Sequence, residues 1–137
     1  MLESVDENLL AVDATSGGDV WAVGSADVLG GRAPLVQRLD AAIWRDESVA
    51  GLPSAEAALT AVTAFGASDV WVGGYQGFAH QLTLLAHWDG SRWSQVPGRS
   101  GVVFDLSALS RRDIWAVGNA NGARGSRSLV ERYACGV

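Results

Sequence analysis

Two histidines and one cysteine are the side chains of this sequence best suited to metal binding or nucleophilic catalysis. His80 and His87 fall on different predicted elements, and no cysteine nearby completes a set of metal ligands. No segment resembles the sharp turn that presents a serine nucleophile, although a serine–histidine–acid group can form from distant positions. Cys135, near the end of the chain, is more typical of a structural residue than of a reactive thiol. We therefore expect no catalytic residues, no metal site, no cofactor and no enzymatic activity.

Nucleotide and calcium binding have equally little support. The sequence contains no lysine, so it cannot carry the lysine-containing glycine-rich loop that holds nucleotide phosphates. The segment Asn119-Ala120-Asn121-Gly122 resembles part of a calcium loop, but no carboxylate follows at the right spacing. This segment is typical of a turn.

The charge of the chain is acidic and unevenly distributed. The net charge of −5 argues against nucleic acid as a partner, because phosphate binding needs a basic surface. Residues 1–90 contain twelve acids and three arginines, a balance of −9, whereas residues 91–137 contain three acids and seven arginines, a balance of +4. This asymmetry is either scatter over a solvated surface or an attraction of the two ends for each other or for the opposite ends of another copy.

Membrane insertion and secretion find no signal in the sequence. No apolar run approaches the roughly 18 residues that a membrane-spanning helix needs. A signal peptide begins with basic residues and continues with an apolar run. The first residues of this chain show neither feature. We expect no membrane insertion, and the cellular location stays open.

A strong internal repeat organises the whole chain. The pattern Asp-(Val/Ile)-Trp-x-(Val/Gly)-Gly occurs at 19–24, 69–74 and 113–118, and each copy also has an apolar run before it and another after it. The repeated residues are Asp19, Trp21, Gly24, Asp69, Trp71, Gly74, Asp113, Trp115 and Gly118. Self-similarity at this period is typical of repeat architectures.

Each copy is predicted to form four antiparallel strands, which in the first copy are 9–15, 20–25, 34–39 and 43–49. Small polar tetrads between the first two strands predict hairpin turns. We expect the repeated aspartate to accept backbone N–H bonds in the turn, and the tryptophan to be buried with its indole N–H bonded. The glycine is expected to permit an unusual backbone angle or a close approach. Residues 54–58 could form one helical turn. A four-stranded sheet at this period predicts a propeller blade.

Several motifs resemble the kelch-type propeller repeat: Gly73-Gly74-Tyr75-x-Gly77, then Trp88-Asp89, then Trp93 and Val96-Pro97. The form Asp-Val-Trp-Ala-Val-Gly is similar to a bacterial propeller repeat of secreted or surface proteins. The first and third copies depart from kelch, because Val23 and Val117 precede a single glycine. The resemblance implies an all-β propeller that acts as a non-enzymatic protein-interaction module.

The number of copies is too small for a closed ring, since propellers typically have about 4–8 blades. We predict one unit over 1–137, with blade 1 at about 9–50, blade 2 at about 59–97 and blade 3 at about 103–137. Residues 2–5 precede the first copy where 93–96 precede the third, so we expect them to be a displaced fourth strand that completes blade 3. Two chains would then form a six-bladed homodimer by strand exchange. The alternative is a fragment of a larger propeller protein.

The loops between the second and third strands are the predicted recognition surface. These loops, at 25–32, 75–81 and 119–127, contain glycine and differ between copies, as binding loops on a rigid scaffold do; plain solvated loops are the alternative. The candidate ligand-binding residues are Tyr75, Phe78, His80, Asn119, Asn121 and Arg124. We expect a protein partner. A carbohydrate-binding, lectin-like propeller is the alternative, although the repeat assigns most of the six tryptophans to packing.

Overall fold

The computed structural model describes residues 6–29, 31–122 and 125–134, which form three antiparallel sheets. The first sheet contains β1 (Glu7–Ala14), β2 (Val20–Val28), β3 (Gly31–Asp40) and β4 (Ile43–Asp46). The second contains β5 (Ala57–Gly66), β6 (Asp69–Gln76), β7 (Leu82–Trp88) and β8 (Trp93–Gln95). The third contains β9 (Gly101–Ser110), β10 (Asp113–Gly122) and β11 (Gly125–Ala134).

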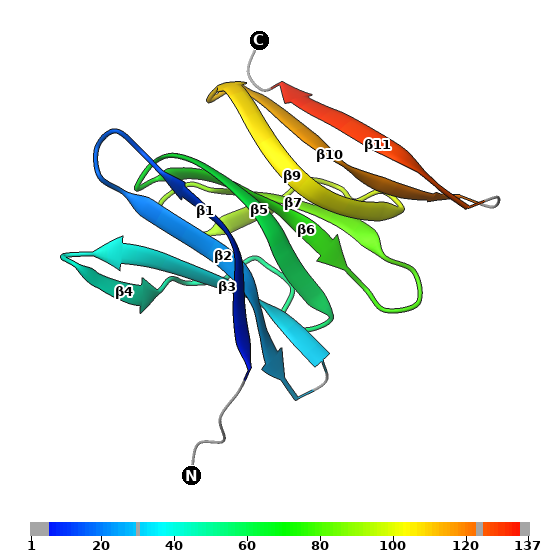
Figure 1. The fold of residues 1–137 in the computed structure, drawn as a ribbon, viewed down its shortest axis with the longest axis horizontal. Helices are drawn as coiled ribbons and strands as arrows, with labels where there is room; N and C mark the ends of the chain where they lie inside the picture. Colours follow the sequence, from blue (N-terminus) through cyan, green and yellow to red (C-terminus); the bar gives the residue numbers. More distant parts are fainter. Residues whose placement is uncertain (1–5, 30, 123–124, 135–137) are drawn as a thin grey trace.

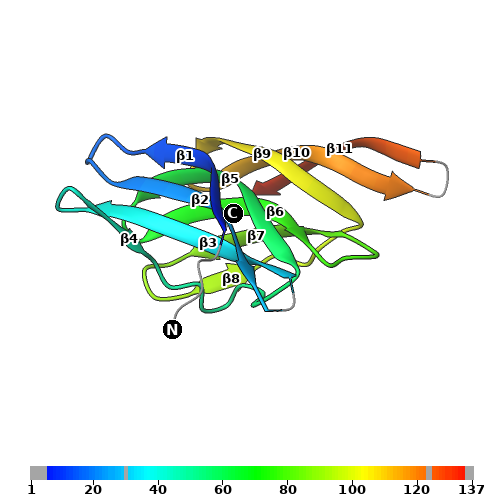
Figure 2. The ribbon, with the colours of Figure 1, turned by 60° about the horizontal axis from the view of Figure 1, so that its bottom comes forward.

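The sheets follow one another in chain order, and the second lies between the other two (Figure 1). Each begins with a strand that packs on its neighbour, since β5 contacts both β1 and β9 (Figure 2). No helix occurs among the described residues, so the single helical turn expected at 54–58 is absent and β5 begins at Ala57. This succession of meandering sheets has a propeller-like architecture.

The predicted strands match the observed ones at their centres and differ at their ends. In the first sheet the polar tetrad at 16–19 connects β1 to β2, as expected for a hairpin. The second and third strands extend further than predicted, while β4 ends at Asp46 rather than at residue 49. The third sheet has three strands in the described part of the chain, and residues 2–5, predicted to complete it, lie outside the described residues.

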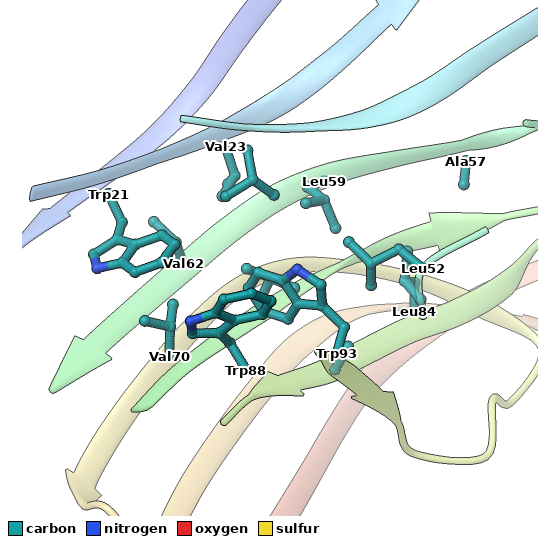
Figure 3. Packing of buried hydrophobic residues seen from close by; sticks show 13 residues of the cluster. Trp21, Val23, Leu52, Ala57, Leu59, Val62, Val70, Leu84, Trp88 and Trp93 are labelled. Carbon is teal, nitrogen blue, oxygen red and sulfur yellow. The ribbon is translucent and has the colours of Figure 1, made fainter. Parts of the chain in front are cut away.

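The first core fills the space between the first and second sheets (Figure 3). Trp21 and Val23 project from β2 toward Leu59 and Val62 of β5, and Trp88 closes this core from β7. The rings of Trp21 and Trp88 lie 6.3 Å apart, and a further tryptophan, Trp93, lies 5.3 Å from Trp88. Burying each such side chain stabilises the fold by roughly 1.5–3 kcal/mol or more. Trp21 and Val23, two residues apart on β2, thus present the same face of the strand to this core.

The second core repeats this arrangement between the second and third sheets. Trp71 and Leu85 of the second sheet pack against Val103, Ile114 and Ala116 of the third. Trp21 and Trp71 thus both point toward the sheet that follows them in the chain. Trp115, the third copy, is 36% exposed, because no sheet follows the third one in the described part of the chain.

The repeated glycines are required by a close approach of the first strand of each sheet. A methyl group on Gly24 would lie 1.7 Å from the carbonyl oxygen of Asn8, and one on Gly74 would lie 2.0 Å from that of Ala58. Gly118 meets its first strand in the same way. The strand is irregular here, with register shifts between Leu9 and Ala11 in β1 and at the matching place in the other sheets. The prediction of a close approach is confirmed.

The expectation that the repeated tryptophans hydrogen-bond through their indole N–H is wrong for two of them. Nε1 of Trp21 and Nε1 of Trp71 are buried without a partner. Trp88 and Trp93 do find acceptors, since their Nε1 atoms donate to the carbonyl oxygens of Ala67 at 3.1 Å and Ser48 at 2.9 Å. The difference arises because Trp88 and Trp93 reach connecting segments, whereas Trp21 and Trp71 point into the middle of an interface between sheets.

Candidate functional site

Two of the three predicted recognition loops are hairpin ends rather than long loops. Strands β2 and β3 are separated only by residues 29 and 30, and β10 and β11 only by residues 123 and 124. Glycines beside these turns adopt positive φ, 127° at Gly31 and 110° at Gly125, which favours tight reversal of the chain. Of the three predicted recognition loops, only the connection between β6 and β7, at residues 77–81, is a loop in the described part of the chain.

A cleft of 590 Å³ opens at this end of the molecule between the first and second sheets. We call it the loop cleft. Its lining comes from the β2–β3 hairpin and from the segments around β5 and the β6–β7 loop of the second sheet. The lining residues are Asp27, Val28, Gly31, Arg32, Glu56, Ala57, Tyr75, Gly77, Phe78 and Gln81.

An exposed aromatic ring forms one side of the loop cleft. Phe78 is 69% exposed, which is unusual for a large apolar side chain and typical of a contact surface. Its ring crosses to the first sheet: a methyl group on Gly31 would lie 3.1 Å from Cζ of Phe78. Tyr75, half-buried on β6, adds a second ring with a hydroxyl group. The cleft therefore offers flat apolar surface beside hydrogen-bonding groups.

The charged groups of the loop cleft are two acids and one arginine. Asp27 and Arg32 face each other across the hairpin and approach to 3.8 Å, but both are more than half exposed, so this ion pair stabilises little. Glu56 has a φ of 56°, a strained backbone for a residue with a side chain. Its carbonyl oxygen accepts a hydrogen bond of 2.7 Å from the N–H of Gly77, which fixes the connection. These groups can bind a ligand, and no nucleophile and base lie paired among them.

The structure distributes the predicted site residues over three places. Tyr75 and Phe78 line the loop cleft, and His80 lies exposed in the same loop outside its lining. Asn119 and Asn121 lie on β10 of the third sheet, where they pair with Ser128 and Ser126 of β11. Arg124 lies outside the described residues.

Sequence reasoning missed Asp27, Arg32 and Glu56. The signal for Asp27 and Arg32 was present: once a two-residue turn is assigned at 29–30, these residues become direct cross-strand partners. For Glu56 the signal was its position immediately before the first strand of the second copy.

A second hollow, of 560 Å³, lies between the second and third sheets and includes Asp69, Trp71, His87, Ser94 and Arg111. Nε2 of His87 lies 2.7 Å from Oδ1 of Asp69, and Ser94 is the register partner of His87 on β8. These residue types match a serine–histidine–acid group. A repeated structural role explains the His87–Asp69 pair more simply.

The same pair occurs in every sheet, with arginine in place of histidine in two of them. Arg38 donates to Asp19 at 2.9 Å, and Nε of Arg132 donates to Asp113 at 2.8 Å. Each cation also covers the repeated tryptophan: the Arg38 guanidinium lies 5.3 Å from the Trp21 ring. The repeated aspartate therefore bonds a side chain on the neighbouring third strand of its sheet, and the prediction that it caps backbone N–H groups in the turn is wrong.

Two aspartates have a pKa that their hydrogen-bond partners lower. The hydrogen bonds from Arg132, and its charge, hold the pKa of Asp113 below its ordinary value. Asp89, in the turn between β7 and β8, has a lowered pKa because its carboxylate accepts backbone N–H bonds from Ser91 and Arg92, at 2.9 and 3.0 Å. These hydrogen bonds account for both lowered pKa values, and both aspartates lie outside the lining of the loop cleft.

Comparison with known proteins gives no family assignment: no family model matches the chain, and no curated protein matches it. Within the described ranges, no helix is long and apolar enough to cross a membrane. Across the same residues, no group of three or more histidine, cysteine or acidic side chains is placed to hold a metal ion.

Proposed function

We propose that this chain is a non-enzymatic binding protein, half of a six-bladed propeller that a second copy completes, and that it recognises a protein partner at the loop cleft. The observation that carries the binding role is the exposed Phe78 ring beside Tyr75 and Glu56 in the loop cleft. Aromatic anchors in a rigid cleft are the usual centres of protein interfaces. The closed ring would hold two such clefts on one scaffold.

Support for closure comes first from the third sheet. Trp115 and Val117 on β10, together with Val130 on β11, are exposed on one face. Their counterparts in the second sheet include Trp71 and Leu85, which are 3% and 4% exposed beneath the third sheet. The first and second sheets each carry such a face, and in both cases the following sheet covers it. Exposed apolar patches of this kind mark interaction surfaces.

The first sheet supplies the complementary face. Leu9, Val12 and Trp44 are exposed and line a shallow hollow with Ala22. Their counterparts on the second sheet, Leu59 and Trp93 among them, are buried against the preceding sheet. The first sheet of one copy can therefore cover the third sheet of another as the third covers the second. A two-fold axis makes both such contacts identical, which closes the ring rather than extending a filament.

The charge distribution supports the same assembly. The acidic part of one copy, with a balance of −9 over residues 1–90, would meet the basic part of the other, with +4 over residues 91–137. Such complementarity favours encounter and orientation of the two copies.

The mass in solution tests closure. We expect light scattering to give twice the chain mass of 14.3 kDa, and Trp115→Glu to shift the protein toward monomer. Leu29→Glu is the matched control, because Leu29 is fully exposed at the β2–β3 hairpin tip and far from the face carrying Trp115. A wild-type monomer at micromolar concentration would contradict the dimer and favour a fragment of a larger propeller.

Binding is tested with a peptide-display library and a glycan array. We expect selected peptides to bind the wild type and to lose affinity at least tenfold with Phe78→Ala, roughly the effect of an interface anchor, but not with the exposed Phe104→Ala on β9. The carboxylates and amide beside the rings would also suit a sugar, so glycan retention that is lost with Tyr75→Ala would favour the lectin-like alternative. If the chain bound neither a peptide from the display library nor a glycan on the array, the proposed role of the cleft would be contradicted.

A further inference from the structure

A following segment of the chain covers the outer edge of the second sheet, whereas no described residue covers the outer edge of the third sheet. Along β7, the N–H of Val96 donates to the carbonyl oxygen of Leu85 at 2.8 Å, and the N–H of Thr83 donates to that of Arg99 at 2.7 Å. Leu82 also pairs antiparallel with Ser100. Residues 96–100 thus continue along β7 after β8 ends, before the chain crosses to β9. The strand β11, by contrast, is an edge strand in the described part of the chain.

The structure identifies which residues correspond to this covering segment. The first strands of the three sheets begin at equivalent positions, Glu7, Ala57 and Gly101, each two residues before the aligned apolar residue. Residues 2–6 therefore correspond to 96–100. This places Leu2 at the position of Val96, three residues later than its predicted match to Trp93. In the same alignment β11 matches β7, so that Arg127 corresponds to Leu82 and Ser128 to Thr83.

We propose, resting on the dimer of the proposed function, that a second copy adds to the outer edge of β11 at Asp6, the residue that precedes its β1. Asp6 of the second copy then faces Arg127, as Ser100 faces Leu82. This is addition of a strand to an exposed sheet edge, in which main-chain bonds give affinity and side chains give register.

The charges of the described residues favour this register. Arg127 and Asp6 are both exposed, and neither forms an ion pair with another described residue. The main chain of Asp6 is held at the edge of the first sheet, because its carbonyl oxygen accepts a hydrogen bond of 2.9 Å from the N–H of Asp27. Opposite charges at directly facing positions stabilise a strand pair, and like charges destabilise it.

A single copy cannot make this contact with itself. Asp6 is hydrogen-bonded to the first sheet and Arg127 belongs to the third, with the second sheet between them (Figure 1). Packed sheets are about 10 Å apart, so two interfaces separate these residues by about 20 Å before the width of the sheet is added. The facing residue must therefore come from a second copy, whose first sheet covers the third sheet of this one.

Charge exchange tests the register. We expect Asp6→Arg and Arg127→Asp each to weaken dimerisation about three- to tenfold, measured by sedimentation, since each creates a like-charge pair on an exposed edge. The double exchange should restore the dissociation constant to near the wild-type value. Restoration is the decisive result. If each single variant only destabilised the fold, the losses in dimer affinity would add in the double variant rather than cancel.

A disulfide provides an independent test in a Cys135→Ser background. Asp6→Cys combined with Arg127→Cys should give a covalent dimer on a non-reducing gel. The control is Asp6→Cys with Leu82→Cys, because Leu82 holds the equivalent position on β7 and already faces Ser100; this pair should give none. A stable dimer without the cross-link and without charge rescue would overturn this inference while leaving closure intact. A wild-type monomer would overturn both.

Discussion

Nε2 of His87 lies 2.7 Å from Oδ1 of Asp69, at the position where the first and third sheets place an arginine beside the equivalent aspartate. The His87 ring also lies 4.9 Å from that of Trp71, as Arg132 lies 5.2 Å from Trp115. Each sheet thus joins its second and third strands through one acid, one arginine or histidine, and one tryptophan. The second sheet differs in using histidine at this position.

Replacing this histidine by arginine should be tolerated. We expect His87→Arg to keep the thermal midpoint within a few degrees of the wild type, because Arg38 and Arg132 show that arginine fits the equivalent position. His87→Ala should lower the free energy of unfolding by about 1 kcal/mol, since it leaves a partly exposed carboxylate without its main partner. Urea denaturation measures both. A larger loss for His87→Arg than for His87→Ala would show that histidine has a role beyond pairing.

The repeated glycine within each second strand should be irreplaceable. Gly74→Ala would place a methyl group 2.0 Å from the carbonyl oxygen of Ala58, which forces the backbone of β5 to move. We expect a loss of about 3 kcal/mol or more in unfolding free energy. Gly66→Ala is the control, because no atom lies within 4 Å of the added methyl group, and it should change stability by less than about 1 kcal/mol. Equal effects in urea denaturation would refute the close-approach explanation.

Much of this fold is readable from the sequence, because the residues that specify it repeat. Gly24, Gly74 and Gly118 recur since every sheet brings its first strand against its second, and the tryptophans recur since every sheet must cover the next. The partner of the repeated aspartate was not readable in this way. It lies on the third strand, and the local tetrad suggests a turn bond that the structure does not use.

The candidate site was only partly predictable. Phe78 belongs to the β6–β7 loop and Tyr75 lies near the end of β6, and both were predicted as aromatic residues of a glycine-containing segment that differs between the copies. Asp27 and Arg32 escaped because the hairpin was interpreted as a loop, and a two-residue turn changes which side chains face each other. The cleft itself depends on the packing of two sheets, and no single segment encodes that geometry.

The turn between β3 and β4 should be a site of easy stabilisation. Ala41 and Ala42 both adopt positive φ, 49° and 68°, which is the backbone of a type I′ turn and strained for alanine. We expect the change of Ala41 to Asn and Ala42 to Gly to raise the free energy of unfolding by about 1 kcal/mol. The thermal midpoint should rise, with an unchanged circular dichroism spectrum. The reverse result would show that contacts of the alanine methyl groups outweigh the strain.

At acidic pH, Asp89 should lose its stabilising effect on the fold. Its pKa is lowered in the folded state by the N–H groups of Ser91 and Arg92, so the carboxylate stabilises the fold above the unfolded-state pKa and loses this effect as the pH falls through the folded-state pKa. We expect Asp89→Asn to lower the thermal midpoint at neutral pH. The difference from the wild type should shrink below the ordinary aspartate range and disappear once Asp89 is protonated. A difference that stays constant down to about pH 2 would contradict a charge effect.

Two tryptophans at the same repeat position should behave differently when removed. Trp93 is 1% exposed between the first two sheets, and Nε1 donates to the carbonyl oxygen of Ser48 at 2.9 Å. Trp44, its counterpart on β4, is 46% exposed on the face of the first sheet that we propose to meet a second copy. We expect Trp93→Ala to lower the unfolding free energy by about 3–5 kcal/mol at any protein concentration.

Trp44→Ala should act on association instead. At concentrations low enough for dissociation, the unfolding free energy should change by less than about 1 kcal/mol, because an exposed side chain contributes little to the isolated chain. At higher concentrations the variant should fall below the wild type, since binding of a second copy stabilises the folded state by mass action. Urea denaturation over a range of protein concentrations separates the two effects. A loss as large as that of Trp93→Ala in the dilute chain would place Trp44 in the core of the single copy.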